Sequence, residues 1–305
     1  MNKQTKFLII IVGPTAVGKT SLAIELAKHY QTEIISADSR QFYKETNIGT
    51  AKPSAIELAE IPHHFINSLA IEENYTAAQF EKDAIKCIEK IHQNKDIAIM
   101  AGGSGLFVRA VTDGFDELPA IDPEIRKKLN QDFEKNGIEF LQQQLKIVDP
   151  EYFNQVDLAN PQRIIRSLEV YQATKTPYST FRKGTTKDRN FTPIKIGLTL
   201  PREKLYARIN SRVDEMISNG LVEEATNLFP FKHYNSLQTV GYTEIFNYLE
   251  GKTSLIEAVD KIKQNSRRLA KRQLTWFTKD SEINWFQHPD LKEVVSLIEQ
   301  KIKPK

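Results

Sequence analysis

One stretch near the start of the chain constrains its fold more than any other. Residues 7–12, FLIIIV, form a continuous apolar run, and the glycine-containing segment GPTAVGKT follows directly at 13–20. A run of this kind predicts a central strand buried on both faces. Residues 19–30 then carry Leu and Ala side chains at helical spacing. Strand, turn and helix in this order predict an α/β fold with a parallel sheet.

The segment at 13–20 fits the pattern G-x-x-x-x-G-K-[ST], which between a strand and a helix is typical of phosphate-binding loops. Its glycines allow backbone N–H groups to turn toward phosphate oxygens, and the start of the helix adds a partial positive charge. Lys19 would neutralise phosphate, and the Thr20 hydroxyl would bind Mg²⁺. The predicted diphosphate loop comprises Gly13, Pro14, Thr15, Ala16, Val17, Gly18, Lys19 and Thr20.

The remaining pattern predicts how the fold is divided. Further strands are expected at 33–37, 97–101, 193–200 and 283–286, and helices at 76–92, after Gly105, at 202–219, at 253–278 and at the end. Residues 118–188 look helical and free of strands, with breaks at prolines and at Gly137. We therefore predict a P-loop-type parallel sheet flanked by helices with a helical insertion, divided as 1–115, 116–190 and 191–305.

Composition limits the possible locations and partners. No apolar run approaches the ~20 residues that span a bilayer, and the first apolar run is too short for a signal peptide, so we expect a cytoplasmic protein without membrane contact. Cys87 is the single cysteine and is expected to be a buried structural thiol. The formal net charge is +3, and this excess falls within residues 201–305. No long apolar helix face is left unassigned, which favours a monomer.

Asp38 ends the second short strand, at the edge where parallel sheets bind ligands. It could act as a general base, as a Mg²⁺ partner or as a helix N-cap. The third strand runs into Gly102-Gly103 without the acid that ATPases and GTPases usually carry there. That absence disfavours a nucleotide hydrolase and leaves open a kinase that uses Asp38.

The predicted helix at 253–278 separates an apolar stripe from a basic face. The stripe contains Leu255, Val259, Ile262, Leu269 and Trp276. Between 261 and 272 there are six cations and no acid, which favours a phosphate backbone over ordinary solvated surface. These cations are Lys261, Lys263, Arg267, Arg268, Lys271 and Arg272.

Two further pairs leave alternatives open. Arg208 and Arg212 lie four residues apart and could clamp a phosphate or form salt bridges with Asp214 or Glu215. The adjacent His63-His64 pair has no matching cluster, so no zinc site is expected.

Six segments together resemble one known family. They are GPTAVGKT, ISADSRQFYKETNIGTAKP, AGGSGLF, NPQRIIRSLEVY, VGYTEI and RRLAKRQLTWF, in that order. With them the chain resembles the tRNA dimethylallyltransferases, also called tRNA isopentenyltransferases of the bacterial type, from about Leu8 to about Phe286. The resemblance implies transfer of a dimethylallyl group from dimethylallyl diphosphate to N6 of adenosine 37 beside the tRNA anticodon. Diphosphate is then the leaving group, so a phosphate loop serves without ATP.

The resemblance also implies roles for individual residues. Asp38 would accept the N6 proton, Lys19, Thr20 with Mg²⁺ and Arg212 would stabilise the leaving diphosphate, and Ser104 would lie near the reacting centre. Contacts with the tRNA anticodon stem-loop are implied for Asp38, Ser39, Arg40, Gln41, Arg126, Gln162, Arg163, Ile164, Ile165, Arg166, Gln238, Thr239, Val240, Gly241, Tyr242, Thr243, Lys271, Arg272, Gln273, Thr275 and Trp276. A small-molecule or nucleoside kinase and a nucleotide-dependent RNA-binding switch are the competing hypotheses.

Overall fold

The computed structural model describes residues 5–116, 118–119, 121–184 and 186–303. The chain divides into two compact units, Met1–Thr112 with Asp188–Lys305, and Asp113–Lys187. The first unit is built around a sheet, and the described residues of the second are helical. The division into three segments at 115/116 and 190/191, and the tRNA contact of the middle one, stay predictions. In the described ranges no helix is both long enough and apolar enough to cross a membrane.

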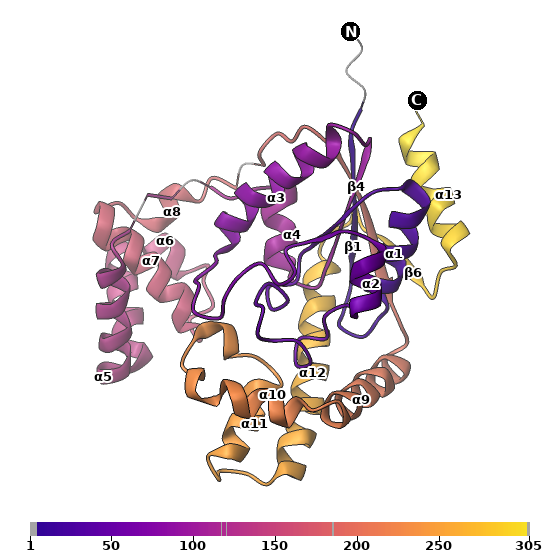
Figure 1. Cartoon of the computed structure of the whole chain (residues 1–305). Coiled ribbons are helices and arrows are strands. Elements are labelled where there is room, and N and C mark those ends of the chain that lie inside the picture. Colours follow the sequence, from indigo (N-terminus) through magenta and orange to yellow (C-terminus); the bar gives the residue numbers. More distant parts are fainter. Residues whose placement is uncertain (1–4, 117, 120, 185, 304–305) are drawn as a thin grey trace. The chain divides into compact units, whose positions relative to one another are not determined.

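A parallel sheet forms the centre of the first unit, which confirms the predicted fold class (Figure 1). In the described residues its order is β3-β2-β4-β1-β5-β6. The strands are β1 (Phe7–Val12), β2 (Ile34–Ser36), β3 (His63–His64), β4 (Ile97–Gly102), β5 (Thr192–Thr199) and β6 (Asn284–Gln287). Parallel pairing aligns the carboxyl ends of β1, β2 and β4, so the loops that follow these strands meet at one edge.

Strand β1 is buried along its whole length because both faces of the sheet are covered. Leu8, Ile10 and Val12 face one hydrophobic cluster. The alternate residues Phe7, Ile9 and Ile11 face the other. Figure 1 shows α3 (Ala77–His92) and α4 (Gly105–Thr112) on one side of the strands and α1 (Lys19–Tyr30) and α13 (Leu291–Ile302) on the other. Two-sided burial is the reason for the unbroken apolar sequence of β1.

Several short elements lie outside the sequence-based expectations. These are α2 (Ala55–Glu60), α10 (Leu221–Leu228), α11 (Tyr242–Leu249) and the two-residue strand β3, together with the 3₁₀ turns η1 (Phe229–Phe231) and η2 (Asn235–Leu237). Each is shorter than the segments over which hydrophobic periodicity can be read. The longer helices α9 (Arg202–Ser218) and α12 (Leu255–Phe277) lie where the sequence predicts them.

Helix α12 differs from expectation in which residues it buries. Ala258, Ile262, Ala270 and Phe277 are its buried side chains, whereas Trp276 is 40% exposed. Of the predicted apolar stripe, Ile262 is buried and Trp276 is exposed, so the stripe does not coincide with the buried face of the helix. Ala258 and Ala270 are buried although they lie outside the stripe, and residues this small do not stand out in a pattern of hydrophobicity.

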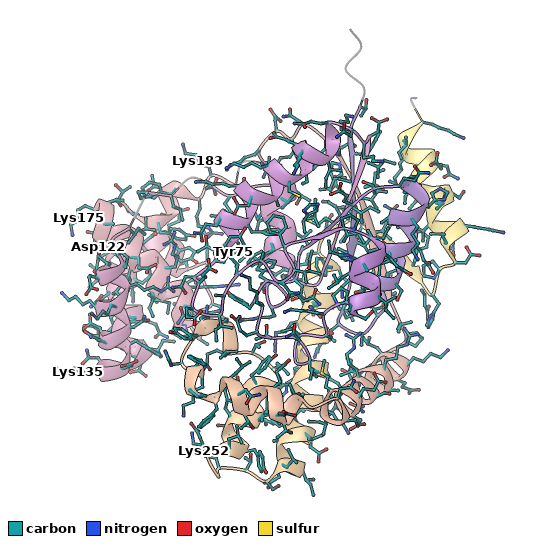
Figure 2. All side chains as sticks on the ribbon, viewed as in Figure 1. Tyr75, Asp122, Lys135, Lys175, Lys183 and Lys252 are labelled. Carbon is teal, nitrogen blue, oxygen red and sulfur yellow. The ribbon has the colours of Figure 1, made fainter. Side chains whose placement is uncertain are left out.

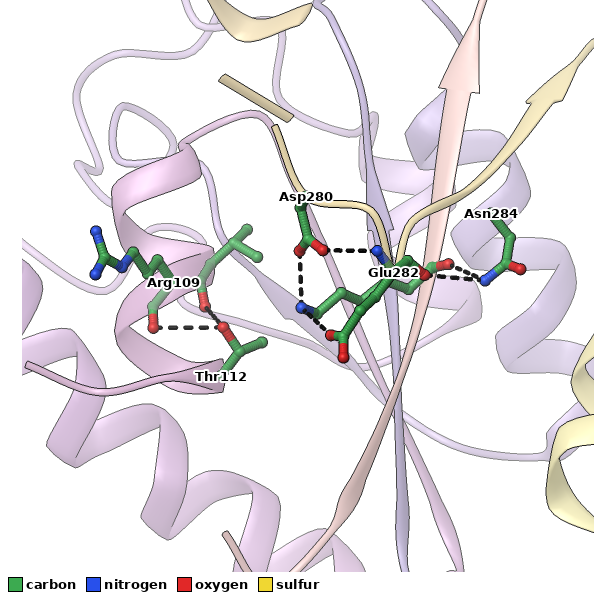
Figure 3. A network of polar contacts seen from close by, with 7 residues as sticks. Arg109, Thr112, Asp280, Glu282 and Asn284 are labelled. Atoms are coloured by element: carbon green, nitrogen blue, oxygen red, sulfur yellow. Dashed lines mark hydrogen bonds and ion pairs between the residues drawn. The ribbon is translucent and has the colours of Figure 1, made fainter. Parts of the chain in front are cut away.

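An ion-pair network joins the start of β6 to β5 (Figure 3). The Lys195 Nζ atom lies 2.7 Å from Asp280 and 2.8 Å from Glu282. The Asn284 side chain donates to the Lys195 carbonyl oxygen at 3.0 Å. Burial alone would lower the pKa of Lys195, but these hydrogen bonds with the two carboxylates raise it. The network fixes the chain where α12 ends and the edge strand begins.

Cys87 lies on α3 and is half-buried against one of the core clusters. Burial raises the pKa of its thiol to about 11, so the thiol stays protonated and unreactive at neutral pH. This agrees with a structural role.

The second unit packs its helices around a core of its own. They are α5 (Pro123–Val148), α6 (Pro150–Phe153), α7 (Pro161–Thr174) and α8 (Tyr178–Phe181). Three of them begin at a proline, which suits the first turn because it lacks an N–H. Helix α5 breaks at Gly137, where φ is 77°. Figure 2 labels the exposed side chains of Asp122, Lys135 and Lys175 on this unit.

Candidate active site

The loop at 13–20 connects the central strand β1 to helix α1. Gly13 has φ of 145° and Gly18 has φ of 111°, values that disfavour any side chain. Gly18 is the N-cap of α1, and no side chain of the described residues hydrogen-bonds to the first amides of this helix. Unsatisfied N–H groups at a helix start bind anions well. The local geometry can therefore hold a phosphate group.

Lys19 extends back over this loop. Its Nζ atom donates to the Pro14 carbonyl oxygen at 2.7 Å. Burial lowers the pKa of Lys19 to about 8, an effect that the Asp38 carboxylate opposes and the Arg212 guanidinium reinforces. Burial destabilises the charged form of this ammonium, and the negative charge of a bound phosphate would stabilise it.

Two arginines of α9 approach the same loop. Arg212 Nη1 lies 3.4 Å from Thr15 Oγ1, and Arg208 Nη1 lies 3.4 Å from the Val17 carbonyl oxygen. Both side chains line a cavity of about 480 Å³ beside the loop. Asp214 pairs instead with Lys263 at 2.6 Å, and among the described residues no ion pair joins either arginine to Asp214 or Glu215. Glu215 is nevertheless the carboxylate that most opposes the burial-driven lowering of the Arg212 pKa, so it acts on Arg212 without a direct ion pair, and the phosphate clamp stays a prediction.

Asp38 lies two residues beyond β2, half-buried. Its Oδ1 atom accepts the Arg40 N–H at 3.1 Å and so closes a turn. No helix begins at this turn, so the alternative that Asp38 is a helix N-cap was wrong. Its negative charge opposes the burial-driven lowering of the pKa of Lys19, Arg40 and Arg212. The carboxylate thus belongs to the same electrostatic cluster as the phosphate loop.

Ser104 brings the turn after β4 to the Asp38 turn. Its N–H donates to the Ala37 carbonyl oxygen at 3.2 Å, and its hydroxyl accepts the Ser39 N–H at 3.1 Å. The same hydroxyl donates to Ser39 Oγ at 3.2 Å. Gly102 permits this approach, because a Cβ atom there would overlap the Ala37 backbone. Ser104 and the turn at residues 37–39, far apart in the sequence, are therefore held together by hydrogen bonds.

A carboxylate that the sequence did not single out anchors the segment after Asp38. Glu224 on α10 accepts the backbone N–H groups of Asn47, Ile48 and Gly49 at 3.1, 2.9 and 3.1 Å. The Tyr242 hydroxyl also donates to it, at 2.6 Å. Burial and the adjacent Glu224 carboxylate raise the pKa of Tyr242, so its hydroxyl remains a donor. No motif marks Glu224, because its role arises from tertiary contact.

The residues of the first unit expected to touch tRNA divide into two groups. Lys271, Arg272, Thr275 and Trp276 of α12 are exposed. Tyr242, in contrast, is fully buried, so a tRNA contact through its side chain is wrong. Gln273 is half-buried and bonds to Thr15 and Gly103.

Other residues of this group hold the loops around the site. Arg40 donates to the Asn235 and Ser236 carbonyl oxygens, and Gln41 donates to those of Thr50 and Ala51. Gln238 donates to the Lys232 carbonyl oxygen.

In the helical unit the expected tRNA residues also divide. Ile164 and Ile165 are fully buried in its core, so tRNA contacts through these two side chains are wrong. The buried Glu169 carboxylate pairs with Arg126 at 3.2 Å and with Arg166 at 3.3 Å, and both guanidiniums remain partly exposed. Gln162 accepts from Arg126 at 2.8 Å, and Arg163 is exposed. Sequence ranges carried over by resemblance do not separate core from surface residues.

Fold and site together define the class: a P-loop-type α/β protein whose phosphate loop faces arginines and a carboxylate, with a helical insertion. The sequence profile of the IPP transferase family matches residues 41–280. A tRNA dimethylallyltransferase of Christiangramia forsetii is 52% identical over 98% of this chain and 99% of its own length. One of Flavobacterium johnsoniae is 50% identical, with 98% and 99% covered. The chain belongs to the IPP transferase family, as the resemblance of its motifs predicted.

Solved structures agree with this assignment. The tRNA isopentenylpyrophosphate transferase of Bacillus halodurans superposes with a TM-score of 0.73 at 37% identity, covering 98% of this chain and 97% of that one. A eukaryotic dimethylallyltransferase acting on tRNA gives a TM-score of 0.76 at 28% identity, covering 97% and 77%.

Proposed function

We propose that the protein transfers a dimethylallyl group from dimethylallyl diphosphate to N6 of adenosine 37 in tRNA and releases diphosphate. The observation that carries this proposal is the single cluster formed by the phosphate loop, Arg212, Asp38 and Ser104. It supplies cations for a leaving diphosphate and a carboxylate for the attacking nucleophile. Membership of the IPP transferase family, and relatives named tRNA dimethylallyltransferases, support the same chemistry.

The bond changes follow from the positions of these charges. The bond between prenyl carbon 1 and the diphosphate oxygen breaks, and its electron pair stays on the leaving group. Lys19, Arg212 and the first amides of α1 stabilise that growing negative charge. The adenine N6 lone pair forms the new bond to carbon 1. The proton that N6 loses passes to the Asp38 carboxylate, which acts as the general base.

Adenine can reach such a site only after it leaves the base stack of the anticodon loop, because chemistry on a base requires the base to be exposed. We assign Ser104 and Ser39 to the wall beside Asp38, where their hydroxyl pair keeps the turn in place. Exposed cations on α12, including Arg268, Lys271 and Arg272, and Arg163 of the helical unit are assigned to the tRNA backbone.

Mg²⁺ fits this site through Thr20. Thr20 is the second residue of α1, half-buried, and its hydroxyl makes no hydrogen bond within the described residues. No cluster of three His, Cys, Asp or Glu side chains suited to a metal occurs in those residues. Mg²⁺ characteristically uses few protein ligands and takes its other oxygens from substrate phosphates and water. When bound it would neutralise charge on the diphosphate.

We also propose that the protein is a cytoplasmic monomer.

The direct test mixes purified protein, Mg²⁺, labelled dimethylallyl diphosphate and an anticodon stem-loop that contains A37. We expect label in the RNA and stoichiometric release of diphosphate, and no label in a stem-loop with guanosine at position 37. ATP turnover with phosphate transfer to a small hydroxyl acceptor, and no RNA labelling, would refute the proposal in favour of a kinase. Retention of stem-loop binding without transfer would favour an RNA-binding switch.

A further inference from the structure

Gln273 of α12 connects two active-site loops. Its Oε1 atom accepts the Thr15 N–H in the phosphate loop at 2.8 Å. Its Nε2 atom donates to the carbonyl oxygen of Gly103, in the turn after β4, at 3.0 Å. Both polar ends of one half-buried side chain are therefore satisfied, each by a backbone group of a different loop. Such a side chain fixes the distance between the loops.

The glycines of the turn after β4 match this arrangement. A Cβ atom at position 103 would overlap the Gln273 amide nitrogen, and one at position 105 would overlap the Trp276 indole. Neither glycine has the positive φ that would by itself require glycine. Gly103 and Gly105 therefore allow the close approach of α12, whereas Gly102 allows that of the Ala37 backbone.

Thr15 links this contact to the diphosphate cradle. Its N–H bonds to Gln273, and its hydroxyl lies 3.4 Å from the Arg212 guanidinium. If the Thr15 peptide rotates, the Thr15 hydroxyl moves with it, and the Arg212 guanidinium loses its contact with the loop. Gln273 shares the buried face of α12 with Ala270 and Phe277, whereas the neighbouring Arg272 is exposed. The Gln273 side chain therefore lies against the phosphate loop and not on the exposed face of α12.

We propose that Gln273 is a positioning residue for the diphosphate loop and does not contact tRNA, an inference that rests on the proposed function. Without the Gln273 side chain, the Thr15 N–H and the Gly103 carbonyl lose their hydrogen-bond partners. The loop then no longer keeps Lys19 and Arg212 in the positions that bind diphosphate. Diphosphate affinity should then fall, while tRNA affinity, which depends on exposed cations, should not.

The test uses Gln273→Met, which keeps most of the side-chain volume and removes both hydrogen bonds. Titration with inorganic pyrophosphate and Mg²⁺, without tRNA, should show binding weakened roughly 5–30-fold, the effect of about one or two lost hydrogen bonds. The stem-loop dissociation constant should stay within about twofold. In turnover, KM for the prenyl donor should rise and KM for the stem-loop should not. Gln264→Met, nine residues earlier and half a turn around α12, is the matched control and should bind pyrophosphate normally.

Gly103→Ala tests the same contact from the other side. The new methyl group should displace Gln273 and weaken pyrophosphate binding to a similar extent. Combining it with Gln273→Ala should add little, because both changes remove one interaction. Normal pyrophosphate affinity in Gln273→Met, or a loss confined to stem-loop affinity, would overturn the inference. A wild-type protein that binds no pyrophosphate would instead overturn the proposed function.

Discussion

Raising the pH from 7 to 9 should weaken binding of dimethylallyl diphosphate about tenfold through a single side chain, Lys19. In the free protein burial lowers the pKa of Lys19 to about 8. A bound diphosphate places negative charge beside the ammonium and should raise its pKa back toward the ordinary range of a lysine. At any pH between these two pKa values, donor binding is coupled to the uptake of a proton by Lys19. The affinity for the donor therefore falls as the pH rises through this range.

The magnitude follows from the neutral fraction of Lys19. At pH 7 about one molecule in eleven carries neutral Lys19 in the free state, and at pH 9 about ten in eleven do. The charged, binding-competent fraction thus drops about tenfold, equivalent to ~1.4 kcal/mol of binding free energy. Below pH 7 this contribution should be constant.

Calorimetric titration of the donor without tRNA, at pH 7, 8 and 9, measures this dependence. The donor's own ionisation affects every variant equally, so the useful quantity is the ratio of wild type to Lys19→Arg, whose guanidinium stays charged throughout. That ratio of affinities should fall about tenfold from pH 7 to 9. Equal slopes for the two proteins would refute the reasoning, because the titrating group would then not be Lys19.

Two further predictions concern the surface and the fold. Arg268→Ala and Arg272→Ala should each weaken stem-loop binding and reduce the slope of log K against log salt concentration by roughly 0.7–0.9. The control Lys301→Ala, at an exposed position of α13, should change neither. An unchanged slope in the two arginine variants would show that α12 does not bind the RNA backbone. Tyr242→Phe removes one hydrogen bond to the Glu224 carboxylate and should lower the free energy of unfolding by about 1.5–3 kcal/mol. Urea unfolding checks this, and a midpoint equal to wild type would show that the bond contributes nothing.

The central strands β1 and β4 were predictable because each is a six-residue apolar run that is largely buried. Several short elements, such as β3, α10 and α11, were not. Helix α11 has eight residues, too few to show periodicity, and its first residue Tyr242 is, within the described part of the chain, the largest fully buried side chain. A motif shared with a family shows that a residue matters without showing whether it faces the core or the substrate.

The position of the candidate phosphate loop was predictable, because the segment at 13–20 places Lys19 and Thr20 at the start of α1 as expected; the chemical roles of these two residues stay predictions. It was not predictable where function arises from contact between distant segments. Glu224 holds three consecutive amides of residues 47–49, and nothing in its own sequence surroundings indicates that. Gln273 was assigned to tRNA by its motif, whereas its hydrogen bonds go to Thr15 and Gly103.

The rate of a single turnover in Asp38→Asn tests the central claim most directly. Asparagine keeps the shape of the side chain and an oxygen for the Arg40 N–H but cannot accept the N6 proton. With saturating donor and stem-loop, the variant should transfer the prenyl group ~10²–10⁴-fold more slowly while binding the stem-loop as tightly as wild type. A variant that transfers at the wild-type rate would contradict the account, because the proton would then leave by a route that does not involve Asp38.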